Sequence, residues 1–279
     1  MMTCMPRIAI AVHDFERTVA MFRNSLGMPV IDFSNDSVAS LGAKLAMCVP
    51  PGGSNIELMS PADPTAPLSQ SLSRFLDQRG EGLFALMLEA PEPDDEAERL
   101  IDKGLNVLPL MAGAGGRDIH PRSTHGVLIR VYPNNSFKGT LAPTDDPLAL
   151  TGIMRVMIAV SDLDAATAVY GDALGLDHDA QQVDHERGVR FVTVRPPGGG
   201  VIELVTPIDG SGGIGADVSN FLKDRGEGMF TLILESSSPD VVTSTLASRS
   251  IEFTQRPDGT LLDPSQTFGA RICIESAED

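Results

Sequence analysis

The sequence has few cysteines, few basic residues relative to acidic ones, and no long hydrophobic run. Its three cysteines are widely spaced and form no CxxC pair, which excludes a disulfide framework and a zinc knuckle and is typical of a reducing cytosol. The 21 Lys and Arg residues stand against 38 Asp and Glu residues, for a formal net charge of -17, so nucleic acid and anionic membranes are not expected partners. No apolar stretch approaches the roughly 20 residues of a membrane span, and no signal-peptide pattern begins the sequence. We therefore expect a cytoplasmic protein.

What the sequence does contain is an internal repeat. Four segments of the first half, 7–15, 50–58, 79–82 and 121–126, match 155–163, 196–204, 225–228 and 264–269 in the second. The offset between matching segments changes by only a few residues along the chain, which a few short loop deletions explain. Two domains are therefore predicted, residues 1–146 and 147–279, joined by a linker at 138–147 that is rich in Pro, Gly, Thr and Asp.

Hydrophobic periodicity predicts a strand, a capped helix and further strands twice in each half. For the first half, strands are expected near 7–12, 38–49, 54–59, 83–89, 105–110 and 125–132, with helices over 14–25 and 94–103. The second half repeats this order, so the chain is predicted to hold four βαβββ modules. The fold class is α+β, with a helix on one face of each small sheet and the other face free.

These motifs, in this order, resemble those of the vicinal-oxygen-chelate superfamily, which includes glyoxalase I, methylmalonyl-CoA epimerase, extradiol dioxygenases and bleomycin-resistance binding proteins. The resemblance is greatest to methylmalonyl-CoA epimerase and glyoxalase-like proteins. It rests on motifs that span most of the first half: Arg7–Val12 followed by Asp14, Leu26-Gly27, Ile56-Glu57-Leu58, Arg79-Gly80-Glu81-Gly82-Leu83, Gly113-Ala114-Gly115-Gly116 and His120-Pro121-Arg122-Ser123-Thr124-His125-Gly126. The resemblance implies tandem domains in which each pair of modules curls into a cup. It also implies a divalent metal at the base of the cup that stabilises an enolate.

The metal-ligand positions implied by the resemblance carry mostly other residue types in this chain. Relatives typically have His, Glu or Gln, His and Glu on four strands. The matching residues here are Arg7, Glu57, Ala85 and Arg130 in the first half and Arg155, Glu203, Thr231 and Cys273 in the second. A firm divalent site needs three or more protein donors. Because each half keeps one carboxylate at these positions, Glu57 or Glu203, as a weak candidate ligand, a divalent metal is possible but disfavoured and no other cofactor is expected in either cup.

Strand alternation instead places an Arg–Glu–Arg set in each cup. Arg7, Glu57 and Arg130 face inward in the first half, and Arg155, Glu203 and Arg271 are expected to do so in the second. Two hypotheses remain open. The sets are structural salt bridges that fill a former metal site, because buried charges must be paired. Alternatively, they are anion sites in which two guanidinium groups bind a carboxylate, enolate or phosphate.

Four further residues are candidate proton-transfer groups. His120 and His125 lie in the segment that lines the mouth of the cup in epimerase-like relatives, and histidine titrates near neutral pH, so they are candidate acid–base or ligand-binding residues. Glu89 and Glu235 end inward-facing strands and are candidate general bases, although charges at such rims are commonly solvated.

The favoured function is isomerase or lyase chemistry on a small carbonyl compound or acyl thioester. Arg7 and Arg130 would stabilise the anion and Glu57 would move the proton, with Arg155, Arg271 and Glu203 as their equivalents. The alternatives are a metal-free small-molecule-binding protein of the bleomycin-resistance type and a non-catalytic scaffold. The expected ligand is a small anionic or carbonyl-containing molecule. The chain is expected to be a monomer or a homodimer, because tandem domains can replace the dimer that single-domain relatives form.

Overall fold

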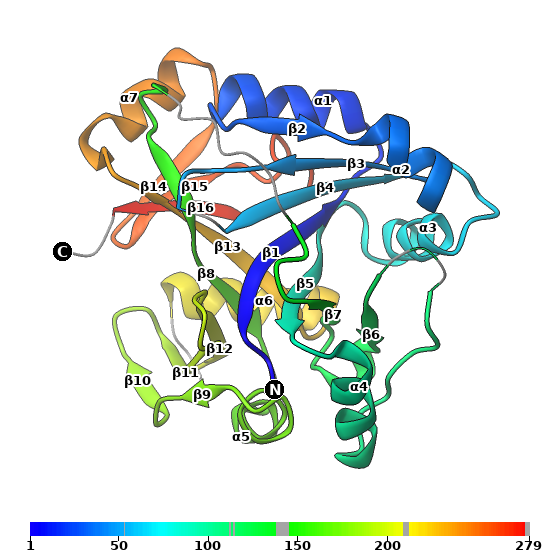
Figure 1. Cartoon of the computed structure of the whole chain (residues 1–279). Coiled ribbons are helices and arrows are strands. Elements are labelled where there is room, and N and C mark those ends of the chain that lie inside the picture. Colours follow the sequence, from blue (N-terminus) through cyan, green and yellow to red (C-terminus); the bar gives the residue numbers. More distant parts are fainter. Residues whose placement is uncertain (53, 112, 114, 138–144, 209–211, 277–279) are drawn as a thin grey trace.

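The computed structural model describes residues 1–279 except 53, 112, 114, 138–144, 209–211 and 277–279 (Figure 1). The predicted linker lies mostly outside the described residues, as does residue 114 of the Gly-Ala-Gly-Gly segment. Within the described ranges, no helix is long and apolar enough to cross a membrane.

The first half forms one mixed sheet of seven strands, in the order β2-β3-β4-β1-β5-β7-β6. β1 runs parallel to β4 and antiparallel to β5, and β5 runs parallel to β7. The elements in chain order are β1 (Cys4–Ala11), α1 (Phe15–Ala20), a π-helical turn (Met21–Ser25), β2 (Val30–Asp32), α2 (Ser34–Leu41), β3 (Ala43–Cys48), β4 (Asn55–Pro61), α3 (Pro67–Arg79), β5 (Gly82–Ala90), α4 (Pro93–Asp102), β6 (Arg117–Ile119), a 3-10 turn (Pro121–Ser123) and β7 (Leu128–Pro133).

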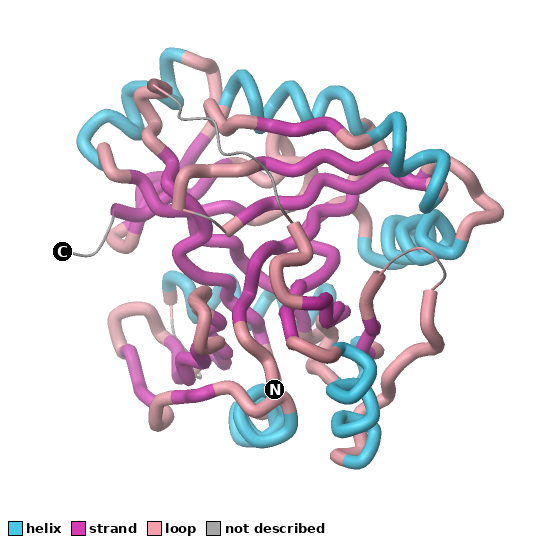
Figure 2. Tube along the Cα trace, in the orientation of Figure 1, coloured by secondary structure: helices cyan, strands magenta, loops and turns pink. Residues whose placement is uncertain are grey.

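The second half repeats this plan in a sheet of nine strands, in the order β10-β11-β12-β8-β13-β16-β15-β14, with β9 paired to β11. Its elements are β8 (Leu150–Ala159), α5 (Leu163–Thr167), a π-helical turn (Ala168–Ala173), β9 (Asp177–His178), β10 (Gln182–Asp184), β11 (Val189–Arg195), β12 (Ile202–Pro207), α6 (Gly213–Arg225), β13 (Gly228–Ser236), a 3-10 turn (Pro239–Val241), α7 (Val242–Ser248), β14 (Phe253–Arg256), β15 (Gly259–Leu262) and β16 (Ile272–Ser276). The predicted α+β class and the tandem cup-shaped halves are therefore confirmed (Figure 2).

Strand alternation divides the apolar residues of each sheet between two faces. Ile8 and Ile10 of β1 belong to a large core that also contains residues of the second half, whereas Ala9 and Ala11 belong to a smaller core on the other face. The large core holds the buried sides of α1, α4, α5 and α7. These four helices therefore lie on the convex faces of the sheets, and the concave faces form the two cups.

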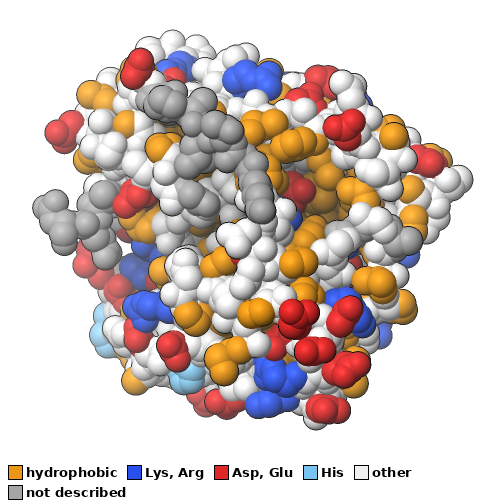
Figure 3. All heavy atoms as spheres, viewed as in Figure 1, with side chains coloured by type: hydrophobic (Ala, Val, Ile, Leu, Met, Phe, Trp, Pro, Cys, Tyr) orange, Lys and Arg blue, Asp and Glu red, His pale blue; other side chains and the backbone are white. Residues whose placement is uncertain are grey.

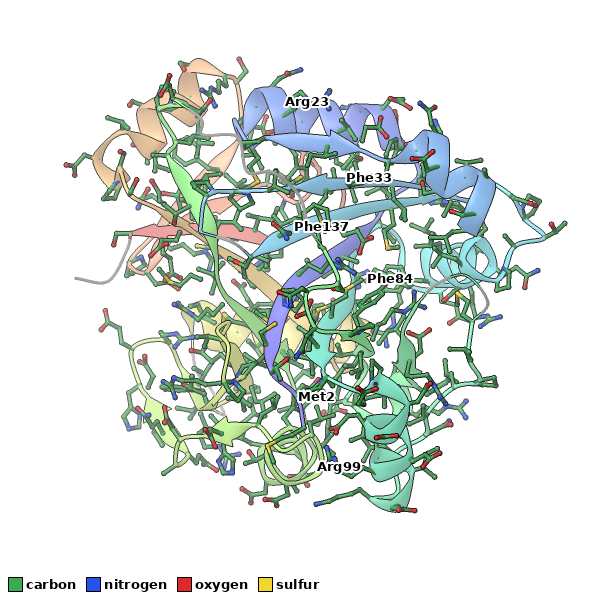
Figure 4. The ribbon with its side chains drawn as sticks, in the orientation of Figure 1. Met2, Arg23, Phe33, Phe84, Arg99 and Phe137 are labelled. Carbon is green, nitrogen blue, oxygen red and sulfur yellow. The ribbon has the colours of Figure 1, made fainter. Side chains whose placement is uncertain are left out.

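The helices join the halves in pairs. In Figure 1, α1 lies beside α7 and α4 lies near α5. Arg99 of α4, labelled in Figure 4, donates to the carbonyl oxygen of Ala173 at 2.9 Å, and Arg249, just after α7, donates to the carbonyl oxygen of Ser25 at 2.8 Å. The two cups consequently open away from the shared core.

Three local features differ from the sequence-based expectation. The strand expected over 38–49 starts only at Ala43, because α2 precedes it and ends at Gly42, whose φ of 69° is left-handed. Of the strand expected near 105–110, only a bridge between Val107 and Ile119 forms. The helices α3 and α6 were not predicted; α3 presents Leu68, Leu72 and Leu76 to the first concave face. Helices thus partly cover both cups.

Glycines make close contacts between the halves, and one of them provides a test of the interface. Gly126 has a φ of 80°, and a Cβ at this position would overlap the carbonyl oxygen of Glu227 in the other half. We expect Gly126→Ala to lower the free energy of unfolding by about 2–3 kcal/mol, measured by chemical denaturation, because the two turns lead directly into β7 and β13 and cannot move apart without disturbing those strands.

Gly104→Ala is the matched control for this prediction. Gly104, just after α4, has a similar φ of 87°, but a Cβ there would meet no atom within 4 Å. The control keeps the strain of a left-handed backbone without the overlap and should cost only about 1 kcal/mol. Equal losses in the two variants would show that the contact between halves is not what Gly126 provides.

Candidate functional site

The first cup brings together the three residues predicted for it, but in two separate pairs. Arg7 on β1, Glu57 on β4 and Arg130 on β7 have exposed fractions of 5%, 6% and 5%. Arg7 Nε lies 3.3 Å from Glu57 Oε2. The strands β1 and β4 are parallel with Ala9 opposite Glu57, and Arg7 lies two residues before Ala9 on the same face of the sheet. Arg130 does not join this pair.

Arg130 is instead held by Asp118, a residue that the sequence analysis missed. β6 and β7 pair with Asp118 directly opposite Arg130, and Nε and Nη2 of Arg130 donate to the two carboxylate oxygens at 2.5 Å each. Burial works to lower the pKa of Arg130, but the hydrogen bond and charge of Asp118 outweigh it and raise the pKa. The short strand that carries Asp118 lies outside the strands predicted from periodicity.

Tyr132 lies between the two ion pairs. The guanidinium carbon of Arg7 is 4.4 Å from the centre of the Tyr132 ring, a cation–π contact, and Nη1 of Arg130 donates to the Tyr132 hydroxyl at 3.5 Å. The aromatic ring therefore fixes both arginines on the floor of the cup without neutralising either.

Three buried polar atoms on this floor have no hydrogen-bond partner. They are Arg7 Nε, Glu57 Oε2 and Asn55 Oδ1, and each belongs to a side chain at least nine-tenths buried. Buried polar groups are normally hydrogen-bonded. Arg7 Nε and Glu57 Oε2 face each other at 3.3 Å as an ion pair without a hydrogen bond, so a molecule that enters the cup can hydrogen-bond to either atom, as well as to Asn55 Oδ1.

The first cup is open on the face shown in Figure 3. Hydrophobic side chains gather there over β3 and β4 and surround a hollow. Phe33 and Phe137, labelled in Figure 4, meet edge to face with ring centres 6.0 Å apart. The polar atoms of the floor therefore lie among apolar walls, the usual character of a small-molecule site.

The second cup holds a continuous chain of ion pairs. Nη2 of Arg155 donates to both carboxylate oxygens of Glu275 at 2.8 Å, and Nε of Arg155 lies 3.8 Å from Glu203. Arg187 donates to the other oxygen of Glu203. Burial raises the pKa of Glu275 despite the charge of Arg155. Arg155 and Glu203 lie together as expected. Glu275 and Arg187 were missed, although Glu275 shares the strand phase of Cys273.

Arg271 lies apart from Arg155 and Glu203, so the predicted second set is divided. Its Nη2 donates to Asp217 of α6 at 2.6 Å, and Arg256 pairs with the same carboxylate. The physical reason is α6, which was not predicted and supplies a carboxylate above this edge of the sheet.

Burial raises the pKa of Cys273 to about 12, which fits a packing role rather than a nucleophile.

The two histidines lie where the halves meet. His120 Nδ1 accepts a hydrogen bond from the Arg122 backbone at 3.1 Å, and His125 Nδ1 lies 3.0 Å from Glu227 of the second half. In the described part of the chain, no hydrogen bond or ion pair joins either histidine to Arg7 or Glu57. His120 instead lines a hollow between the two halves.

Glu89 holds a turn in place. Its carboxylate accepts hydrogen bonds from the backbone N–H of Asn135 at 3.0 Å and from the backbone N–H and hydroxyl of Ser136 at 2.9 and 2.7 Å. Burial works to raise the pKa of Glu89, but these hydrogen bonds outweigh it and hold the pKa below its ordinary value. The other rim carboxylate, Glu235, accepts a hydrogen bond from Thr151.

This lowered pKa predicts a pH-dependent contribution to stability. A carboxyl group with a lowered folded-state pKa stabilises the fold above its unfolded-state pKa of about 4.3, and the contribution is lost as the pH falls through the folded-state value. We expect Glu89→Gln to lower the free energy of unfolding by about 1–2 kcal/mol at pH 7 and by much less at pH 3. Urea denaturation at both pH values measures this. The exposed Glu16→Gln is the control, and a Glu89→Gln penalty that is equal at both pH values would contradict the assignment.

The residue types on the cup floors do not fit a divalent ion. Two of the four family positions in the first half are Arg7 and Arg130, and a guanidinium group has no lone pair to donate. Among the described residues, no group of three His, Cys, Asp or Glu side chains could hold a metal ion.

The halves carry residues of different chemistry at one equivalent register position. Leu261 lies opposite Cys273 in the second sheet, where the first sheet has Asp118 opposite Arg130. The first cup therefore has an ion pair where the second has an apolar pair. In the second cup, Arg155 forms an ion pair with Glu275 instead.

The structure of the chain is similar to several solved structures. Over 99% of this chain and 92% of the other, the structure is similar to a mutant 4-hydroxymandelate synthase from Streptomyces coelicolor, with a TM-score of 0.72 and 14% identity, a similarity of fold alone. Methylmalonyl-CoA epimerase from Mycobacterium tuberculosis is similar over 50% of this chain and 94% of its own, with 25% identity and a TM-score of 0.43. The S. coelicolor epimerase in complex with 2-nitronate-propionyl-CoA is similar over 50% of this chain and 100% of its own, with 26% identity and a TM-score of 0.41. No curated protein sequence matches the chain.

A family model matches most of the chain in two segments, one in each half. The matched residues are 7–120 and 154–260. The segments begin at the first strand of each half, as the internal repeat predicts. The chain therefore belongs to the Glyoxalase/Bleomycin resistance protein/Dioxygenase superfamily.

Proposed function

We propose that the first cup binds a small carbonyl compound or acyl thioester and transfers a proton at the carbon next to the carbonyl, in isomerase or lyase chemistry without a metal ion. The observation that carries this proposal is the pair Arg7 and Glu57. Both side chains are buried on the floor of an open cup, and each has a polar atom there without a hydrogen-bond partner.

Each of the two residues has a defined task. The Glu57 carboxylate takes the proton from carbon, and the resulting enolate oxygen accepts hydrogen bonds from the Arg7 guanidinium. The 3.3 Å separation of Arg7 Nε and Glu57 Oε2 places base and anion-stabilising donor side by side. Delivery of a proton from water to the opposite face of the same carbon, with Glu57 releasing its own proton to water, completes an epimerisation, whereas loss of a leaving group from the neighbouring carbon completes an elimination. Tyr132 keeps Arg7 in position from below.

The first cup is preferred to the second because of how the carboxylates are paired. Glu203 is held by Arg187 and lies near Arg155, and Arg155 is in turn held by Glu275. A carboxylate that already accepts charged hydrogen bonds is a poor base. In this proposal the second half braces the first and has no catalytic part.

A second candidate is metal-free binding without chemistry. It is favoured by the Asp118 carboxylate, which holds Arg130 through two hydrogen bonds, whereas Arg7 is paired with Glu57 without a hydrogen bond. In this candidate Arg7 retains a carbonyl or carboxylate ligand even where no proton moves.

Proton NMR in deuterated water distinguishes these candidates. The substrates are a panel of acyl thioesters and α-ketoaldehydes, and the readout is loss of the signal of the proton next to the carbonyl. Enzyme-dependent exchange supports the isomerase or lyase proposal. Saturable binding in ligand-observed NMR without exchange, lost in Arg7→Leu, supports the binding candidate. Neither exchange nor binding across the panel would contradict both.

A further inference from the structure

A second hollow, separate from the hollow over β3 and β4, lies between the two halves. Its volume is about 700 Å³, and it is lined by α3 and α6 and by the starts of β5 and β13. We call it the central cleft. The volume is in the range of small-molecule sites, roughly 300–1,000 Å³.

The charged residues that line the central cleft are mostly positive. Among the described lining residues, the one carboxylate is Asp217. The five arginines are Arg74, Arg79, Arg122, Arg225 and Arg271. Asp217 pairs with Arg271. The other four arginines form no ion pair with a described carboxylate. The cleft therefore concentrates positive charge in a chain whose net charge is -17.

The two arginines of the repeated RGEG motif meet across the cleft. Arg79 donates to the carbonyl oxygen of Arg225, and Arg225 donates to the carbonyl oxygen of Arg79. Two like charges are thus held close together by backbone acceptors that carry no full charge. Burial and the charge of Arg79 lower the pKa of Arg225. An anion placed between them would relieve their repulsion.

The walls of the cleft are aromatic and come from equivalent positions in the two halves. Phe75 and Phe84 pack edge to face with ring centres 5.1 Å apart, and Phe221 and Phe230 do so at 5.4 Å. All four line the cleft. Apolar walls would bury the body of a ligand while the arginines bind its charged group.

We propose that the central cleft is a second binding site, which takes a small organic anion with an aromatic or other apolar body held between α3 and α6. The proposal does not depend on chemistry in the first cup. The two RGEG arginines bind the anionic group, and the paired phenylalanines contact its body.

The test uses 1-anilinonaphthalene-8-sulfonate, an apolar aromatic anion whose fluorescence rises on binding. We expect saturable binding to the whole chain, weakened about tenfold or more in Arg79→Gln/Arg225→Gln, because two charge-assisted contacts are lost. Arg195→Gln, which alters an exposed arginine paired with Asp179, is the matched control and should bind like the unaltered chain. N-phenyl-1-naphthylamine, which has the same rings but no charge, should bind at least tenfold more weakly than the anion.

A gain-of-binding variant keeps the test independent of folding. Asp217→Asn removes the one lining carboxylate and frees Arg271, so the dye should bind about three- to tenfold more tightly. Unchanged binding in the double arginine variant, equal binding of the uncharged dye, or no gain in Asp217→Asn would each overturn the proposal.

Discussion

Replacing Arg130 with cysteine should lower the free energy of unfolding by about 3–5 kcal/mol, because it leaves the Asp118 carboxylate buried without its partner. Asp118 and Arg130 are each 5% exposed, and both oxygens of Asp118 accept from Arg130. The variant retains no donor that can replace the guanidinium group. Chemical denaturation at pH 7 measures the loss.

The second half of the chain provides the control for this experiment. Leu261 and Cys273 occupy the register position that Asp118 and Arg130 occupy in the first half. Asp118→Leu combined with Arg130→Cys therefore installs a pair that already packs in the equivalent sheet. We expect it to recover at least half of the loss, because an apolar pair can replace a buried ion pair once neither charge remains. A double variant as unstable as the single one, or a single variant that costs less than about 1 kcal/mol, would show that the ion pair does not support the sheet.

Glu57→Gln should lower the rate of proton exchange by about 10²- to 10⁴-fold, the usual contribution of a positioned general base. The amide keeps the shape of the side chain and can still contact Arg7, but it cannot take a proton at neutral pH. Because the charge of Glu57 also pairs with buried Arg7 at 3.3 Å, the variant should lose some stability, although less than a variant that breaks a hydrogen-bonded ion pair. Exchange followed by NMR, with thermal unfolding of the same sample, measures both effects.

Glu203→Gln is the matched variant in the second cup. Glu203 accepts from Arg187 and lies near Arg155, so this change should reduce stability more than Glu57→Gln does. It should leave the exchange rate within about twofold of the unaltered chain. Exchange that survives Glu57→Gln would remove Glu57 as the base. Exchange that disappears in Glu203→Gln but not in Glu57→Gln would move the chemistry to the second cup.

The fold and the floor of the first cup were largely predictable from local pattern. A repeat is visible in the order of residues, and strand alternation with a period of two decides which side chains share a face. Arg7 and Glu57 were predicted to face the same cup and do so, because β1 and β4 are regular strands in parallel register. The apolar residues between them pack on the helices, as Ile8 and Ile10 show.

The partners of the cup arginines could not be predicted in the same way. Asp118 reaches Arg130 through a three-residue strand too short to leave a periodic signal, and Asp217 reaches Arg271 from a helix over the concave face. Those contacts depend on where a turn or a helix packs, which a local pattern does not encode. The same holds for His125, which lies against Glu227 of the other half.

By itself, the sequence determined the tandem α+β architecture and which residues of a regular strand share a face, because these depend on residue type and on short-range periodicity. Only the tertiary structure decided that the first Arg–Glu–Arg set separates into two pairs, that the second cup closes into a chain of ion pairs, and that Arg79 meets Arg225. The reason is physical. A buried charge pairs with whichever opposite charge or carbonyl oxygen packing brings within about 3 Å, and packing between segments more than a hundred residues apart leaves no mark on the local order of residues.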